Sequence, residues 1–190
     1  MLRDISLHIM DLTQNSIRAK ATLVNIDLLT DEKGFLNVSI KDNGCGMKPE
    51  FLKVVTDPFT TERTTRKVGM GIPFFKLSCE TADGNFFIDS VVDEGTVISG
   101  SLRLNSIDRI PLGDLGETIK FLIMYAPDVR YVLKIKSCKD EFILDTDEIK
   151  ETLEDVSILQ QEILEWIKEF VNENVSNIFG GVINEVLGRT

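Results

Sequence analysis

Hydrophobic periodicity predicts a helix followed by a hairpin at the start of the chain. Residues 3–20 carry apolar side chains at helical spacing, and a polar stripe runs beside them, formed by Asp4, His8, Asp11, Asn15 and Arg18. Apolar and polar residues then alternate over 24–28 and again over 36–40, with turn-forming residues at 31–34 between them. This alternation predicts a β-hairpin.

Residues 49–104 predict two more helices and a second pair of strands. Pro49 is a favoured first residue of a helix, which we expect to reach about Val55. Residues 57–68 are rich in Thr, Arg and Lys without apolar periodicity and predict a loop, after which 72–82 is expected to be helical. Strands are expected at 85–92 and 96–104. The order predicts an α+β fold whose antiparallel or mixed sheet carries helices on one face.

A boundary is expected near residue 105, because Pro111 and Gly113 follow the last of these strands. We therefore divide the chain into 1–104 and an extension, 105–190. The extension predicts a helix at 114–125, a hairpin at 128–137 and 141–144, and a helix capped by Asp145 or Thr146. A long amphipathic helix follows and is expected to end near Gly180-Gly181. This helix, with Trp166 and Phe170, could pack on the core or bind a partner, and packing on the core is the favoured interpretation.

Charge separates the two parts and limits the partners that each can take. The net charge is −10, of which residues 1–104 contribute −2 and residues 105–190 contribute −8. An acidic extension opposes binding to nucleic acid and to anionic membranes, but permits a protein partner with a basic surface. The three cysteines are far apart, and neither a signal peptide nor a membrane span is evident, so a cytoplasmic location is expected.

The first candidate for chemistry is the pair Asp11 and Asn15, which lie one helical turn apart and project from the same side of the helix. A carboxylate and an amide oxygen are ligands that suit Mg²⁺ directly or through water. On the helix alone, a solvated polar face is the favoured alternative. The single histidine, His8, is expected to be a capping or helix-face residue.

The second candidate is the turn Asp42-Asn43-Gly44-Cys45-Gly46-Met47, which closes the first hairpin. Its glycines permit backbone conformations with positive φ, and Asp42 would present a carboxylate at the end of a strand. Such a carboxylate can accept a hydrogen bond from the exocyclic amine of adenine. An ordinary turn between a strand and a helix is the alternative.

The third candidate is the glycine pair at the start of the 72–82 helix. Backbone N–H groups at a helix start can bind phosphate, and nearby basic side chains can cover it. The residues concerned are Arg66, Lys67, Gly69, Met70 and Gly71. A solvated basic loop is the alternative for the part before Gly69.

Taken in order, these segments resemble the GHKL ATPase superfamily of gyrase-type topoisomerases, heat-shock chaperone ATPases, histidine kinases and MutL. The pattern is D-x-x-x-N-S-x-x-A-x-A from Asp11, D-N-G-x-G-M from Asp42, Pro58-Phe59, G-x-G from Gly69, and E-G-T at 94–96. The resemblance covers residues 1–104. It implies a Bergerat-type ATP-binding fold: a two-layer α/β sandwich with a mixed, mostly antiparallel sheet that binds Mg-ATP under a lid at 57–70. Residues 105–190 would add an α/β extension.

Position by position, the resemblance implies that Asn15 holds Mg²⁺ and that Asp42 binds the adenine amino group. Thr96 would support Asp42 through a water molecule. The turn residues Gly44, Gly46 and Met47 would border the nucleotide, and Gly69, Met70 and Gly71 would let the lid backbone approach the phosphates. Asp11 falls where hydrolysing members place a glutamate general base. Since an aspartate is one methylene shorter, we predict weak hydrolysis.

The sequence therefore predicts an Mg-ATP-binding protein with weak ATPase activity that acts as a nucleotide-driven switch for a protein partner. One alternative is a protein kinase that phosphorylates a separate protein, as histidine kinases and anti-sigma-factor kinases of this superfamily do. Another is a binding module without turnover. Self-phosphorylation on histidine is not expected, because His8 lies inside the first helix, and the acidic extension argues against a DNA-processing role.

Overall fold

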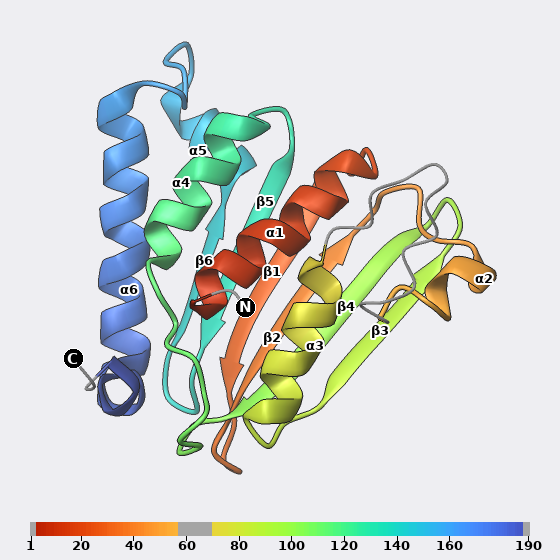
Figure 1. Cartoon of the computed structure of the whole chain (residues 1–190). Helices are drawn as coiled ribbons and strands as arrows, with labels where there is room; N and C mark the ends of the chain where they lie inside the picture. The colour runs from red at the N-terminus through yellow and green to blue at the C-terminus, as the bar shows by residue number, and fades with distance from the viewer. Residues whose placement is uncertain (1–2, 57–69, 188–190) are drawn as a thin grey trace.

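The computed structural model describes residues 3–56 and 70–187, with side chains as far as Gly180. Its centre is one six-stranded sheet in the order β3-β4-β2-β1-β5-β6 (Figure 1). Its strands are β1 (Leu23–Thr30), β2 (Phe35–Asp42), β3 (Phe86–Val91), β4 (Gly95–Arg103), β5 (Arg130–Lys136) and β6 (Glu141–Asp145). Only the β1–β5 pair is parallel. The predicted α+β class with a mixed, mostly antiparallel sheet is confirmed.

Helices cover one face of this sheet, and a long helix lies at its β6 side (Figure 1). α1, α3 and α4 run across the face, and α6 packs beside α4. The helices are α1 (Ile5–Arg18), α2 (Pro49–Leu52), α3 (Gly71–Thr81), α4 (Leu115–Tyr125), α5 (Thr146–Leu153) and α6 (Gln161–Leu187). Within the described residues, no helix combines the length and the apolar character needed to cross a membrane.

α1 is positioned by its cap, its apolar stripe and a contact with the later chain. The side chain of Asp4 accepts a hydrogen bond from the Leu7 N–H at 2.8 Å, which satisfies one of the free donors of the first turn. The apolar stripe of the helix is completely buried, at Ile5, Ile9 and Leu12. The Ser6 hydroxyl also donates to the Leu112 carbonyl at 2.7 Å. The residue before the helix and the segment between β4 and α4 therefore both fix the start of α1.

The chain after residue 104 extends the same sheet. β5 pairs in parallel with β1, from Leu23 opposite Arg130 to Leu29 opposite Lys136, and β6 then forms the edge. The side chains of Tyr131, Leu133 and Ile135 are buried in the common core. The division after residue 104 stays a prediction, and the sheet is continuous across it.

Three local expectations are wrong. α2 ends at Leu52 rather than near Val55, and α6 continues through Gly180 to Leu187. Glycine commonly ends a helix by taking the left-handed conformation, whereas Gly180 stays helical; glycine there costs only about 1 kcal/mol relative to alanine. The aromatic pair on α6 is not packed in the core: Trp166 is 50% and Phe170 37% exposed.

Candidate functional site

Asp42 ends β2 with its carboxylate held by two protein donors. The side chain is 8% exposed. One oxygen accepts a hydrogen bond from the Ser16 hydroxyl on α1 at 2.7 Å, and the other accepts from the Gly44 N–H at 2.8 Å. Because a carboxylate has about four acceptor positions, Asp42 can accept further hydrogen bonds from a ligand. Ser16 was not among the predicted site residues, although it is the serine of the D-x-x-x-N-S motif.

The turn after Asp42 lies directly under the end of α1. The Cys45 N–H donates to the Ala19 carbonyl at 2.9 Å. A Cβ at Gly44 would lie 2.8 Å from the same oxygen, so the backbone passes where no larger residue fits. The Asn43 side chain accepts from the N–H groups of Thr22 and Leu23. Hydrogen bonds therefore join the end of α1, the start of β1 and the Asp42–Met47 turn into one unit.

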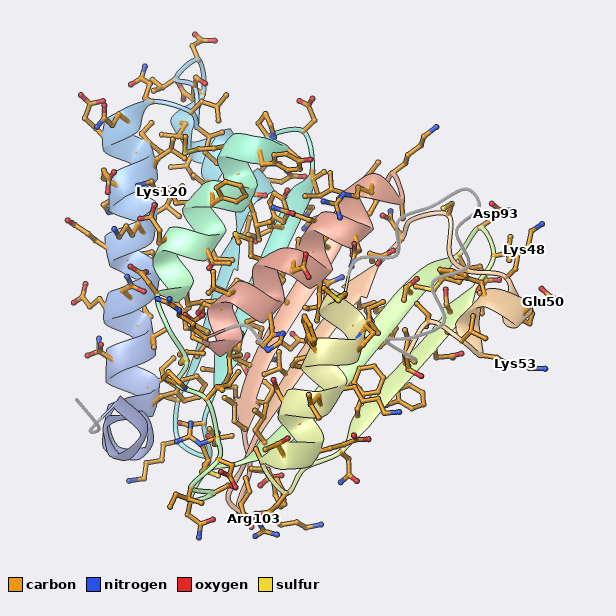
Figure 2. The ribbon with its side chains drawn as sticks, in the orientation of Figure 1. Lys48, Glu50, Lys53, Asp93, Arg103 and Lys120 are labelled. Carbon is orange, nitrogen blue, oxygen red and sulfur yellow. The ribbon has the colours of Figure 1, made fainter. Side chains whose placement is uncertain are left out.

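The turn between β3 and β4 closes on the same unit. Gly46 has a φ of +61°, and a Cβ there would lie 2.0 Å from the Val91 carbonyl oxygen. Gly95 has a φ of +122°, and a Cβ there would lie 1.9 Å from the Asp42 carbonyl oxygen. The Asp93 N–H donates to the Cys45 carbonyl at 3.0 Å. Figure 2 shows Asp93 near Lys48, which follows the turn.

Ser90 connects the two turns and was also missed from the sequence. Its hydroxyl oxygen accepts from the Met47 N–H at 2.8 Å and lies 2.9 Å from both the Gly95 carbonyl and the Thr96 hydroxyl. Thr96 is opposite Asp42 in the β2–β4 register, so it borders the carboxylate. Its support of Asp42 through a water stays a prediction. The sequence did contain a signal for Ser90. The turn between β3 and β4 is short, so it sets Ser90 opposite Thr96.

Over the first two turns of α1, the polar stripe faces α3 rather than solvent. Asp11 is partly buried, and a Cβ at Gly71, the first residue of α3, would lie 2.0 Å from its Oδ2. The structure therefore brings Asp11 to the start of α3. One turn further, the Asn15 side-chain oxygen is partly exposed and accepts from the Arg18 guanidinium at 3.1 Å.

The remaining predicted residues lie at the start of α3 or outside the described residues. Met70 precedes α3 at its N-cap position and is exposed. Arg66, Lys67 and Gly69 lie outside the described residues, as does most of the predicted lid. Among residues 3–56 and 70–180, no three His, Cys, Asp or Glu side chains form a group that could hold a metal ion.

His8 is a core residue and not the capping or helix-face residue that was expected. It is completely buried, and its Nε2 lies 3.0 Å from the Ser78 hydroxyl on α3. Its ring also lies against that of Phe75, with centroids 5.6 Å apart. The error arose because a polar residue on a helical stripe was assigned to the surface, whereas α3 covers this stripe. His8 and Ser78 therefore join the two helices that carry Asp11 and Gly71.

We expect His8 to make the fold sensitive to acid. Burial lowers the pKa of His8 from 6.5 to about 4, so the folded protein disfavours the charged ring. The stability that this gives is complete above pH 6.5 and is lost as the pH falls to 4, by about 3 kcal/mol in total. Urea unfolding of the wild type and of His8→Gln between pH 7 and pH 4 measures this contribution to the free energy of unfolding. Parallel pH profiles for the two proteins would rule it out.

Comparison with known proteins identifies the family that this geometry represents. Residues 3–106 match the family described as Histidine kinase-, DNA gyrase B-, and HSP90-like ATPase. The chain belongs to this family. The match includes every motif around Asp11, Asp42, Gly71 and Thr96, and the predicted resemblance is confirmed. Membership of this ATPase family implies ATP binding.

Individual relatives of this ATPase domain are distant. A Shewanella frigidimarina protein, provisionally named a sensor protein, is 33% identical over 93 residues, which are 47% of this chain and 14% of the relative. The chain thus spans about one seventh of that curated relative. A solved N-terminal domain of a DNA repair protein aligns with a TM-score of 0.50 at 14% identity, covering 76% of this chain and 53% of that one. This likeness concerns the fold alone.

A second solved structure is the ATPase domain of MutL from Aquifex aeolicus, complexed with ADP. It is 20% identical to this chain, with a TM-score of 0.49, and the alignment covers 81% of this chain and 68% of that one.

Proposed function

We propose that this protein binds ATP with magnesium beside α1 and the Asp42–Met47 turn, hydrolyses it slowly, and acts through this cycle as a switch for a partner protein. The observation that carries the proposal is the buried carboxylate of Asp42, which two protein donors orient and which keeps acceptor positions free. The family of the chain supplies the expectation that the ligand is ATP.

At the adenine end, Asp42 would accept the hydrogen bond of the exocyclic amino group. Because Ser16 and Gly44 already hold its two oxygens, the carboxylate needs no reorganisation when the base arrives. Thr96 lies beside it in the sheet. A base with a carbonyl group at the same place, such as guanine, would set an acceptor against an acceptor and would bind less well.

At the phosphate end, the Asn15 oxygen would be the protein ligand of magnesium. Magnesium, when bound, neutralises phosphate charge; it commonly takes few protein ligands and completes its shell with phosphate oxygens and water. The Arg18 guanidinium now donates to this oxygen and would have to release it. The exposed Arg18 side chain is then free to approach the phosphates.

Asp11 is the residue that we assign to hydrolysis. Its carboxylate would accept the proton of the attacking water, as a general base does. Gly71 permits this because it has no side chain where Oδ2 of Asp11 lies. The first N–H groups of α3 would bind a phosphate oxygen beside this carboxylate.

One experiment separates the three activities that the family allows. The protein is incubated with ATP labelled on the γ-phosphate, with and without cell lysate. Release of free phosphate by the protein alone supports the slow ATPase. Label on a second protein supports a kinase acting on a partner, and binding without either product supports a module without turnover. No ATP binding at all would refute the proposal.

Two substitutions at Asp11 test the assignment of the base. Asp11→Asn is expected to bind ATP as the wild type does and to lower phosphate release by about 100-fold, the usual contribution of a general base. Asp11→Glu keeps a carboxylate and is expected to retain hydrolysis. Single-turnover assays with both variants measure this difference. Equal rates for Asp11→Asn and the wild type would remove Asp11 from the mechanism.

A further inference from the structure

α6 has two apolar stripes, and only one of them is used by the fold. Leu164, Ile167 and Val171 are buried against the rest of the protein. Trp166 and Phe170 form the second stripe, one turn apart, with stacked rings whose centroids are 5.0 Å apart. Phe142 of β6 meets the Phe170 ring edge-on at 5.2 Å. We call Phe142, Trp166 and Phe170 the aromatic row.

The side chains of the aromatic row are exposed to an extent that stacking between them does not explain. Half of the Trp166 surface and more than a third of the Phe170 surface are open to solvent. Stacking between neighbouring turns stabilises a helix by only a few tenths of a kcal/mol. Large aromatic side chains that stay half exposed in a preassembled row are typical of the anchors of protein interfaces.

Carboxylates run along the outer side of this row. At 100° per residue, Glu162, Glu169 and Glu173 project within about 60° of Trp166 around the helix axis. All three are exposed, and among the described residues no Lys or Arg side-chain nitrogen lies within 4.0 Å of their carboxylate oxygens. The segment that carries the row has the same sign: residues 141–180 contain eleven Asp and Glu against two Lys.

The two lysines of this segment do not offset the carboxylates beside the row. Lys168 pairs with Glu117 at 2.7 Å on α4, and Lys150 pairs with Asp147 at 3.2 Å on α5. An anionic lipid surface or a nucleic acid would be repelled here. The complementary partner carries positive charge next to apolar groups.

We propose that the aromatic row binds an arginine-bearing helical segment of a partner protein. A guanidinium can pack on the exposed indole of Trp166 and pair at the same time with Glu162 or Glu169, because it is planar and weakly hydrated. Aliphatic side chains on the same segment would cover Phe170 and Phe142. Lysine fits this site less well, since its compact ammonium holds its water more tightly.

The proposal does not depend on nucleotide binding. Figure 1 shows α6 at one side of the molecule and α2, which follows the Asp42–Met47 turn, at the other. The two surfaces can therefore be altered separately. Trp166 is the only tryptophan in the chain, so tryptophan emission, excited selectively over that of the two tyrosines, reports on the aromatic row.

The test uses three labelled peptides that are designed as amphipathic helices. Each has leucines on one face and arginine, lysine or glutamine on the other. Fluorescence anisotropy gives their affinities for the full chain at low and at moderate salt. The arginine peptide is expected to bind at least about fivefold more tightly than the lysine peptide, to shift Trp166 emission to shorter wavelength, and to weaken with salt.

Matched variants separate the row from general acidity. Trp166→Ala, and Glu162→Gln with Glu169→Gln, are each expected to weaken the arginine peptide about tenfold. The pair Glu148→Gln with Glu151→Gln removes the same charge from α5 and should change the affinity less than about twofold. Circular dichroism and ATP binding confirm that each variant is folded.

Several results would overturn the proposal. If the double substitutions on α6 and on α5 weaken the arginine peptide equally, the peptide is attracted by charge and has no defined site. Equal affinities for the arginine and lysine peptides would mean that the guanidinium group is not recognised. Sedimentation that shows a dimer of the wild type, lost in Trp166→Ala, would make a second copy the occupant. Binding of anionic vesicles through Trp166 would make the occupant a membrane.

Discussion

Asn15→Ala is expected to abolish magnesium-dependent ATP binding, with a loss of at least about 100-fold, which is close to 3 kcal/mol. The side-chain oxygen of Asn15 is the only group in our proposal that the protein offers directly to the metal. Alanine removes it without weakening α1, because alanine is the best helix former. Titration of ATP by calorimetry, with magnesium and then with a chelator, measures the effect. The magnesium-dependent part of the affinity should disappear in the variant.

The chain contains a closely matched control one residue away. Gln14 is also an amide on α1, is also partly buried, and also accepts a hydrogen bond from Arg18, at 3.4 Å. Gln14→Ala therefore repeats the loss of an amide and of an Arg18 contact, but it leaves the proposed ligand in place. Its affinity should stay within about twofold of the wild type. If both variants bind Mg-ATP normally, Asn15 does not hold the metal.

The sequence was most informative where backbone geometry alone demands a residue type. Gly44, Gly46 and Gly95 occupy positions where a Cβ would overlap a carbonyl oxygen, and no other residue type avoids this. The helix and hairpin pattern was also predictable, since each element buries one face and alternates at its own period. For these reasons the fold class and the order of motifs around Asp42 could be predicted.

The sequence was least informative where a contact joins distant segments. Ser16 and Ser90 hold the site through hydroxyl groups whose partners are fixed only after the hairpins have packed. His8 was assigned to a surface that α3 covers. A polar residue on a helical stripe has the same appearance in the sequence whether it meets water or another helix. Tertiary packing decides between these environments, and a single chain does not record it.

The aromatic row illustrates the opposite error. Trp166 and Phe170 are large and apolar, and the expectation of a core position follows from their hydrophobicity. Their place on α6 is nevertheless set by Leu164, Ile167 and Val171, which bury the other side of the helix. Hydrophobic periodicity predicts that α6 is amphipathic, but it does not tell which of two adjacent apolar stripes the fold will cover.

Gly46→Ala is expected to have the second large effect, on stability and on ATP binding together. The residue has a φ of +61°, and a Cβ would lie 2.0 Å from the Val91 carbonyl oxygen, which is backbone and cannot rotate away. The Asp42–Met47 turn must therefore move away from β3 and break the hydrogen bond between Met47 and Ser90. We expect a loss of about 3 kcal/mol in the free energy of unfolding.

Gly34→Ala separates the steric overlap from the backbone conformation. Gly34 has a φ of +80°, similar to that of Gly46, but no atom lies within 4 Å of the position of its Cβ. Alanine there meets only the cost of the left-handed conformation, about 1 kcal/mol, and leaves the site untouched. Urea unfolding and ATP titration of both variants test this comparison. Because conformational strain is common to both, the extra loss in Gly46→Ala measures how closely the turn is pressed against β3. Equal losses would show that the turn can yield without affecting Asp42.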